Sequence, residues 1–114
     1  MTKEQFLTTI YKNEDQFTAA THRFINLNFP ELRHFYFHVP NENQHRLVSL
    51  GVLAGVPDFI FIKPSLLFLE LKMPNGTLSP KQKALHQLWA SNGIKITVAY
   101  NPAQVIDFLL TLAI

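Results

Sequence analysis

The clearest helical pattern in the first third of the chain follows Asn13. Asn13 suits an N-cap, and Gln16 lies three residues later, at the spacing of a capping box. Apolar residues then recur every three or four positions until Pro30, which predicts a helix with one buried face. The expected buried positions are Phe17, Ala20, Phe24 and Leu27.

A second helix is predicted in the last third of the chain. Ser79 and Pro80 supply an N-cap and a proline at the first helical position, Gln82 completes a capping box, and Gly93 ends the pattern. The expected apolar stripe consists of Ala84, Leu85, Leu88 and Trp89.

Shorter helices are expected at three other places. Thr2 and Gln5 have capping-box spacing and predict a helix over residues 2–11. Residues 47–54 form a short apolar segment that is ended by Gly55. The last helix follows an Asn-Pro pair near the C-terminus, and its apolar positions are Val105, Phe108 and Leu109.

Four segments have the composition of β-strands. Residues 35–39 are rich in aromatic and β-branched side chains, and residues 94–100 alternate between apolar and polar. Between them, residues 58–62 and 66–72 are largely apolar and are separated by the short segment 63–65, which predicts a hairpin at the centre of a sheet. Together with the helices, these strands predict an α/β sandwich around a mixed sheet.

Charged residues interrupt the predicted hairpin. Glu70 and Lys72 lie two positions apart, so their side chains point to the same face of the strand. If the hairpin loop has three residues, Ile62 pairs with Leu66 and Asp58 falls opposite Glu70. Two carboxylates at cross-strand distance repel each other unless a cation lies between them. The structural alternative is an ion pair of Glu70 and Lys72 on an edge strand, with Asp58 as a turn residue.

An oxygen-only site of this kind favours Mg²⁺ or Mn²⁺ over zinc. Asp58 and Glu70 are the first candidate ligands, and the main-chain carbonyl of Leu71 is another. Lys72 would lie beside the ion, where it could orient a water molecule or stabilise the charge that develops on a phosphate. Glu14, in the first turn of its helix, is expected to add a carboxylate from across the groove.

Composition narrows the class of protein. With 114 residues, of which 47% are hydrophobic and 16% charged, the chain has the size and composition of one globular domain. It has no cysteine, which excludes disulfides and thiolate chemistry and favours an intracellular, cytoplasmic protein. We find neither a signal-peptide pattern nor an apolar run of bilayer length, so no membrane association is expected.

Positive charge is concentrated in the second half of the chain. Residues 1–57 carry five basic and five acidic residues, whereas residues 58–114 carry five lysines and three acids. If Asp58 and Glu70 bind a cation, the second half becomes distinctly positive and suits a polyanion. Scattered, solvated lysines are the common alternative.

Several short motifs occur together in the central part of the chain. Residues 51–58 read Gly-Val-Leu-Ala-Gly-Val-Pro-Asp, residues 70–72 Glu-Leu-Lys, residues 74–76 Pro-Asn-Gly and residues 78–82 Leu-Ser-Pro-Lys-Gln, followed by Gly93. This combination resembles the virus-type replication-repair nuclease domain (VRR-NUC), a family of the PD-(D/E)xK, restriction-endonuclease-like nucleases. The resemblance extends over residues 14–100, which is nearly the whole chain.

The resemblance implies roles for individual residues. Asp58 and Glu70 correspond to metal ligands, Lys72 to the catalytic lysine, Gln82 to the characteristic glutamine on the helix behind the site, and Glu14 to the N-terminal acid. We therefore predict catalytic roles for Lys72, Asp58, Glu70 and Gln82.

Two of these assignments have competitors. Gln82 also occupies the capping-box position of its helix, so a purely structural role competes with contact to lysine, water or DNA. The N-terminal acid is Glu14 in our assignment, but Asp15, Glu4 and Glu31 are alternatives.

By resemblance, the expected fold is a restriction-endonuclease-like three-layer sandwich, with one stand-alone domain over residues 1–114. The implied function is a metal-dependent DNA endonuclease, similar to Holliday-junction resolvases, that acts on branched DNA as a homodimer. A non-catalytic DNA-binding or assembly subunit with the same fold is the alternative. The candidate DNA contacts are Asn41, Lys81 and Lys83. Surface or rim positions, not zinc ligation, are expected for His22, His34, His38, His45 and His86.

Overall fold

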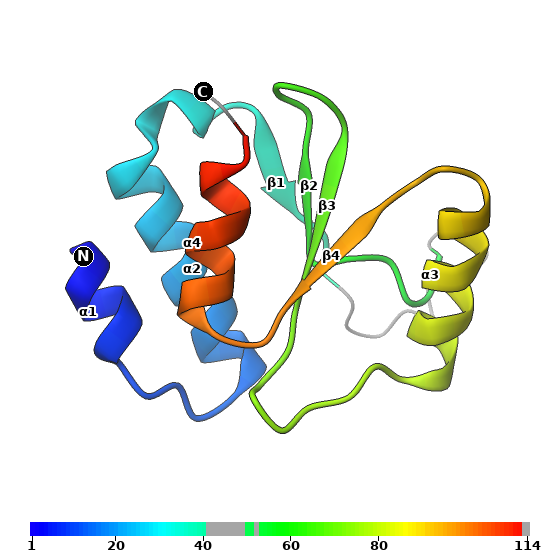
Figure 1. The fold of residues 1–114 in the computed structure, drawn as a ribbon, viewed down its shortest axis with the longest axis horizontal. Helices are drawn as coiled ribbons and strands as arrows, with labels where there is room; N and C mark the ends of the chain where they lie inside the picture. Colours follow the sequence, from blue (N-terminus) through cyan, green and yellow to red (C-terminus); the bar gives the residue numbers. More distant parts are fainter. Residues whose placement is uncertain (41–49, 52, 113–114) are drawn as a thin grey trace.

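A four-stranded sheet runs through the middle of the molecule (Figure 1). The computed structural model describes residues 1–40, 50–51 and 53–112. The strands are β1 (Tyr36–His38), β2 (Phe59–Phe61), β3 (Leu67–Leu71) and β4 (Ile96–Ala99), and they lie side by side in this order. β2 is antiparallel to both β1 and β3, whereas β3 and β4 are parallel. The predicted mixed sheet with the hairpin at its centre is confirmed.

The register of the central hairpin also agrees with the sequence prediction. Phe59 pairs with Leu69 and Phe61 with Leu67, which is the pairing that a three-residue loop requires. Continued by one residue beyond β2, this register brings Asp58 beside Glu70. The strands themselves are shorter than predicted: β2 ends at Phe61, and β3 begins only at Leu67.

Helices cover both faces of the sheet and create three layers. The helices α1 (Lys3–Thr8), α2 (Glu14–Asn28) and α4 (Pro102–Leu110) lie on one side, and α3 (Pro80–Ser91) lies on the other (Figure 1). A short 3-10 turn, η1 (Pro30–Leu32), follows α2. The expected α/β sandwich is therefore confirmed.

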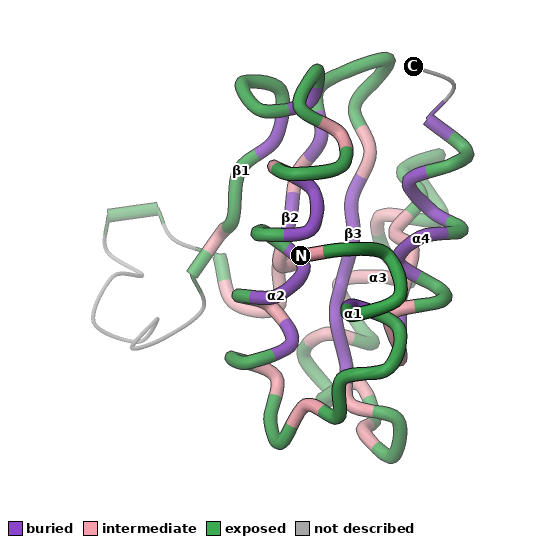
Figure 2. The backbone as a smooth tube through the Cα atoms, turned by 90° about the vertical axis from the view of Figure 1, so that its left-hand side faces the viewer, coloured by how far each residue is buried: buried purple, intermediate pink, exposed green. Residues whose placement is uncertain are grey.

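Most of the buried apolar side chains lie between the sheet and the layer of three helices. Figure 2 shows buried stretches along β2, β3 and the facing sides of α2 and α4. Phe6 of α1 stacks on Phe24 of α2 with ring centroids 4.5 Å apart, and Phe61 meets Phe108 of α4 edge to face. Burial of these aromatic rings fixes α1, α2 and α4 against one face of the sheet.

The helices begin where their capping residues predict. In each case the side chain of the N-cap accepts a hydrogen bond from the main-chain N–H three residues later, which satisfies a donor that the helix itself leaves free. The capping residues are Thr2, Asn13, Ser79 and Asn101.

Two predictions of buried helix faces were partly wrong. Leu27 is 58% exposed, because Ile25 occupies the buried side of α2 in its last turns. No residue of α3 is fully buried, and Leu88 is 59% exposed. Among the described residues, α3 is the one helix on its side of the sheet, so no neighbouring helix covers it. It contacts the sheet through the ring of Trp89, which packs on Phe68.

The helix expected over residues 47–54 is absent from the part of this segment that can be described. Residues 47–49 and 52 lie outside the described residues. Leu50, Gly51, Leu53 and Ala54 are not in an α-helix, and Gly51 has φ +90°, a left-handed conformation that a helix does not accommodate. None of the helices in the described part of the chain is both long enough and apolar enough to span a bilayer.

Candidate active site

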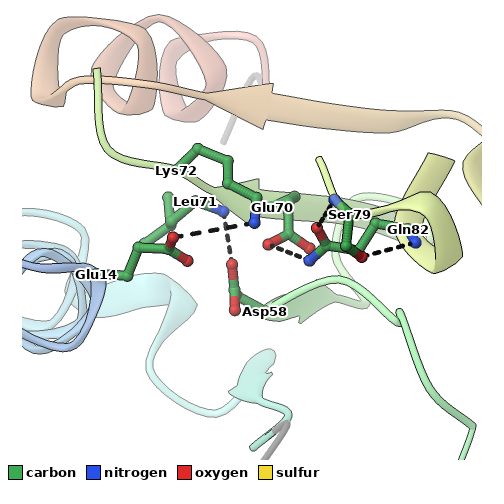
Figure 3. Close-up of polar contacts among 7 residues, drawn as sticks. All are labelled: Glu14, Asp58, Glu70, Leu71, Lys72, Ser79 and Gln82. Atoms are coloured by element: carbon green, nitrogen blue, oxygen red, sulfur yellow. Dashed lines mark hydrogen bonds and ion pairs between the residues drawn. The ribbon is translucent and has the colours of Figure 1, made fainter. Parts of the chain in front are cut away.

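Asp58 is fixed to the central strand by its side chain. Its Oδ2 atom accepts a hydrogen bond of 2.6 Å from the main-chain N–H of Leu71 in β3 (Figure 3). The N–H and C=O of one strand residue point to the same side of the strand, so the carbonyl of Leu71 also faces the side on which Asp58 lies. Asp58 and the main chain of Leu71 are thereby held together; the hairpin register had predicted Asp58 opposite Glu70 but not this hydrogen bond.

Gly55 explains how the segment before Asp58 reaches this position. Its φ is +85°, and a Cβ atom there would lie 3.2 Å from the carbonyl oxygen of Lys81 and 3.3 Å from the amide nitrogen of Gln82. The loop that carries Asp58 thus packs directly on the first turn of α3. A glycine is needed at this point for both its backbone conformation and its lack of a side chain.

Glu70 is the most deeply buried charged side chain of the site. It is 1% exposed, its Oε2 atom lies 3.4 Å from Nε2 of Gln82, and its Oε1 atom is buried without a hydrogen-bond partner. Burial, followed by the neighbouring carboxylate of Asp58, raises the pKa of Glu70 to about 9. A carboxyl group in these surroundings is poorly satisfied without a cation or a proton.

Gln82 has the capping role that the sequence allowed, and its side chain also contacts Glu70, which the sequence did not predict. Its Oε1 atom accepts a hydrogen bond of 2.9 Å from the N–H of Ser79, and its own N–H is bound by Oγ of Ser79, which completes the capping box. The other end of the same amide, Nε2, points to Glu70 (Figure 3). The helix cap therefore fixes the rotamer with which Gln82 faces the site.

Lys72 lies at the end of β3 beside Glu14. Its ammonium group is 3.9 Å from Oε2 of Glu14, and its main-chain N–H donates to the carbonyl of Ala99 in β4. Lys72 is buried, whereas the side chain of Glu14 is half-exposed. The alternative of an edge-strand ion pair between Glu70 and Lys72 is wrong, because β3 is an interior strand and the ion pair of Lys72 is with Glu14.

A small pocket of about 180 Å³ opens above these side chains. Both Glu14 and its competitor Asp15 line it, whereas Glu4 and Glu31 do not. Of these two acids, Glu14 forms an ion pair with Lys72 and Asp15 does not, as far as the described residues show. The full lining is Glu14, Asp15, Thr18, His38, Pro40, Asp58, Glu70 and Gln82.

The donor set is compatible with a hard divalent cation. Among the described residues, no three side chains of the His, Cys, Asp and Glu types are gathered tightly enough to form a complete metal cage. Mg²⁺ does not need one, because it commonly binds one or two carboxylates and keeps several water ligands. Asp58, Glu70 and the carbonyl of Leu71 fit this requirement. The Oε1 atom of Glu70, which has no hydrogen-bond partner, is available as a metal ligand.

The predicted DNA contacts divide into two groups. Lys81 and Lys83 are exposed in the first turn of α3, on either side of Gln82. Asn41 lies outside the described residues.

His38 is exposed, as the sequence predicted, but its place in the pocket beside Asp58 was not predicted. Its Nδ1 atom lies 2.9 Å from the carbonyl oxygen of Asp58, and its ring packs on Phe59 at a centroid distance of 5.3 Å. It lines the same pocket as Glu70. The pairing of β1 with β2 creates this proximity, and no spacing motif in the sequence signals it.

The other described histidines are elsewhere. His22 bonds the hydroxyl of Tyr36 at 2.7 Å, and His34 is exposed. Burial and the positive charge of Lys72 lower the pKa of His86 on α3. His45 lies outside the described residues.

Known proteins resemble this chain in sequence and in structure. The model of the VRR-NUC domain family matches residues 2–102. A solved structure described as a VRR_NUC domain protein is similar with a TM-score of 0.75 and 22% sequence identity, over 91% of this chain and 90% of that one. No curated protein matches the chain significantly. The structural likeness shows the shared fold, and the family match extends over most of the sequence.

Proposed function

Since the chain belongs to the VRR-NUC domain family and has its nuclease-type fold, we propose that it is a metal-dependent DNA endonuclease. The observation that carries the proposal is the facing pair Asp58 and Glu70, with the buried Oε1 of Glu70 unpartnered and Lys72 two residues further along the strand. A buried carboxylate such as Glu70 beside a second carboxylate is unfavourable without a cation, and strongly perturbed groups of this kind are typical of functional sites.

Asp58, Glu70 and the carbonyl of Leu71 would hold the metal, Mg²⁺ or Mn²⁺, with Glu14 able to contribute from the opposite side of the pocket. The bound ion would supply a Lewis acid that polarises the phosphate and lowers the pKa of a coordinated water. A cation bound there would also offset the repulsion between the carboxylates of Asp58 and Glu70.

The protein's own groups position and stabilise the reactants. Lys72 carries a buried positive charge beside Glu14, which lines the pocket, and in this proposal Lys72 orients the attacking water or stabilises the charge of the phosphoryl oxygens. Glu14 holds the ammonium group of Lys72 from the start of α2. Gln82, fixed by the helix cap, orients the carboxylate of Glu70. In this arrangement Gln82 is a positioning residue.

DNA is the substrate that the charge distribution supports. Lys81 and Lys83 are exposed in the first turn of α3, on either side of the pocket residue Gln82, and in this proposal they contact phosphates. Asn41 retains its proposed contact with the DNA backbone. We also propose an intracellular, cytoplasmic location, in line with the absence of cysteine.

The finer proposal is a homodimer that acts on branched DNA, in the manner of a Holliday-junction resolvase. It is supported by the apolar surface that the single chain leaves exposed on the α3 side, which includes Leu88 and Ile94. A hollow of about 440 Å³ adjoins this surface between α3 and β4. Burial in a two-fold interface would remove such groups from water. We expect Leu88→Lys to reduce the mass measured by light scattering from dimer to monomer, and an unchanged mass would contradict this interface.

Metal binding and cleavage together test the proposed function. We expect Mg²⁺ or Mn²⁺ to raise the melting temperature of the wild type and of Asp107→Asn, an exposed control on α4, but not of Asp58→Asn. Labelled four-way junction, flap and linear duplex are then compared: the branched substrates should be cut with Mg²⁺, and not with chelator or by Asp58→Asn. DNA binding without any cleavage would favour the alternative of a non-catalytic subunit.

A further inference from the structure

A second hollow, of about 580 Å³, lies along α2 and β1. It is beside the pocket that is lined by Asp58 and Glu70, which we call the catalytic pocket. It shares Asp15, Thr18 and His38 with that pocket, so the two hollows are direct neighbours. Its volume lies in the range of ordinary ligand sites, roughly 300–1,000 Å³. Nothing in the proposed chemistry at Asp58 and Glu70 requires this space.

One wall of the hollow is a stripe of α2. Asp15, Thr18, Ala19 and His22 line it, at the spacing of residues that share one helix face. The two central positions carry small side chains, which leaves room between the helix and the sheet. The stripe begins next to Glu14 and so leads directly away from the catalytic pocket.

The opposite wall is β1, which is an edge strand in the described part of the chain. The main-chain N–H of Val39 donates to the carbonyl of Asp58, and the main-chain N–H of Ile62 donates to the carbonyl of Phe35. The main-chain groups of Phe35 and Val39 therefore point toward β2 and its flanking residues. The main-chain groups of Tyr36 and His38 therefore point to the outer edge of the sheet. This edge offers both donors and acceptors beside the hollow.

The side chains of this wall add an aromatic surface and a positive charge. The ring of His38 is held in place by the Asp58 carbonyl and by Phe59. Tyr36 is fixed by its hydrogen bonds to His22 and Asn26, so it is a rigid part of the wall. Arg33, exposed and also part of the lining, supplies the cation.

We propose that this hollow, the α2–β1 groove, receives one unpaired nucleotide of the DNA, next to the phosphodiester bond that is cut. The proposal rests on the proposed nuclease function and narrows its substrate class to DNA with an unpaired nucleotide beside the cut. A free base offers a planar face for the His38 ring and exposed edges for the donors and acceptors of β1. Arg33 can bind the adjoining phosphate. A base inside a duplex has its pairing edge occupied and its faces stacked, so it cannot enter.

The groove can be blocked without touching the catalytic residues. Ala19 is exposed on α2, and Ala19→Leu would fill the space while keeping a good helix former. The matched control is Ala103→Leu, an exposed alanine on α4 that is not part of the groove lining. Arg33→Gln removes the cation, and Arg23→Gln is its control at an exposed position outside the lining.

Fluorescence of 2-aminopurine tests the groove without turnover. The base analogue is placed at successive positions around the cleavage point of a flap and of a continuous duplex, and binding is measured with Ca²⁺. We expect a fluorescence change at one unpaired position of the flap for the wild type, Ala103→Leu and Arg23→Gln. Ala19→Leu and Arg33→Gln should lose it and bind the flap about tenfold more weakly, while their duplex binding is unchanged.

Position-independent fluorescence, or the same change in Ala19→Leu as in Ala103→Leu, would overturn the groove assignment. Cleavage with Mg²⁺ is a separate readout, which decides the nuclease function itself. An enzyme that cuts duplex and flap equally in the wild type and in Ala19→Leu is a nuclease without this groove function.

Discussion

The side-chain amide of Gln82 joins a helix cap to the buried carboxylate of Glu70. Its oxygen accepts from Ser79 at 2.9 Å, and its nitrogen lies 3.4 Å from Oε2 of Glu70. The capping box thus determines how the amide approaches the carboxylate. The residue that caps α3 therefore also orients the carboxylate of Glu70.

The two roles of Gln82 can be separated by Gln82→Glu. Glutamate also completes a capping box, so we expect α3 to keep its N-cap. The amide donor to Glu70 is replaced by a carboxylate that repels it, however, and we expect DNA cleavage to fall about tenfold or more, at least as for the loss of one hydrogen bond to a charged group. Urea unfolding and cleavage rates measure the two effects separately.

Ser79→Ala is the converse control. It removes the capping oxygen and should cost about 1 kcal/mol of stability. We expect a smaller loss of cleavage than in Gln82→Glu, since the Gln82 donor remains. Cleavage by Gln82→Glu at the wild-type rate would show that the contact with Glu70 does not matter.

Glu70 should make the metal-free protein less stable as the pH rises. The folded protein keeps the Glu70 proton up to a pKa of about 9, whereas the unfolded chain releases it near the ordinary value of 4.5. Between these values the folded state binds more protons, so the free energy of unfolding falls with increasing pH. Denaturation in chelator should show this slope in the wild type and a flatter profile in Glu70→Gln.

The same proton should compete with the metal. Binding of Mg²⁺ needs the ionised carboxylate, so affinity should increase with pH and binding should release about one proton near neutral pH. Calorimetry in buffers of different ionisation enthalpy measures the release. Glu31→Gln, a change at an exposed acid, should behave as the wild type. Affinity that does not change with pH would exclude Glu70 as a protonated ligand.

Gly55 should be required for the position of Asp58. In Gly55→Ala the new Cβ would meet the main chain of Lys81 at 3.2 Å, in addition to the strain of φ +85°. Gly93→Ala is a matched control, because φ is +81° there and no atom lies within 4 Å. Both variants should lose about 1–2 kcal/mol from backbone strain.

Only Gly55→Ala should also lose the stabilisation by Mg²⁺, because its loop is pushed away from α3. Thermal unfolding with and without the metal measures this difference. Equal Mg²⁺ responses in the two alanine variants would show that the close approach of Gly55 does not position Asp58.

Glu14 and Asp15 can be distinguished by single amide substitutions. Glu14→Gln removes the ion pair with Lys72, which should change stability by less than about 1 kcal/mol because Glu14 is half-exposed. We expect it to slow cleavage clearly more than Asp15→Asn does, since Asp15 lines the pocket without an ion pair to Lys72 among the described residues. The reverse order of cleavage rates would assign the N-terminal acid to Asp15.

Local sequence signals predicted the frame of the site well. The caps at Asn13 and Ser79 set where α2 and α3 begin, and therefore where Glu14 and Gln82 lie. The short hairpin set the register that brings Asp58 beside β3. These features depend on neighbours within a few residues or on one tight turn, so the sequence contains enough information to place them.

Features that depend on distant contacts were not predicted. Leu88 is exposed because no other helix in the described part of the chain packs on α3. The apolar pattern along the sequence of α3 cannot show whether such a neighbour exists. His38 reaches the pocket only because β1 pairs with β2. The left-handed conformation of Gly51 likewise breaks a segment whose apolar pattern predicted a helix.

Single-turnover cleavage by Lys72→Met tests the central claim most directly. Methionine keeps the length of the buried side chain but removes its charge, and Lys63→Met is the control at an exposed lysine near Phe35. With Mg²⁺ and labelled flap or junction DNA, we predict cleavage by the wild type and by Lys63→Met, and none by Lys72→Met at unchanged DNA binding. Cleavage by Lys72→Met at the wild-type rate would contradict a catalytic site at Asp58, Glu70 and Lys72.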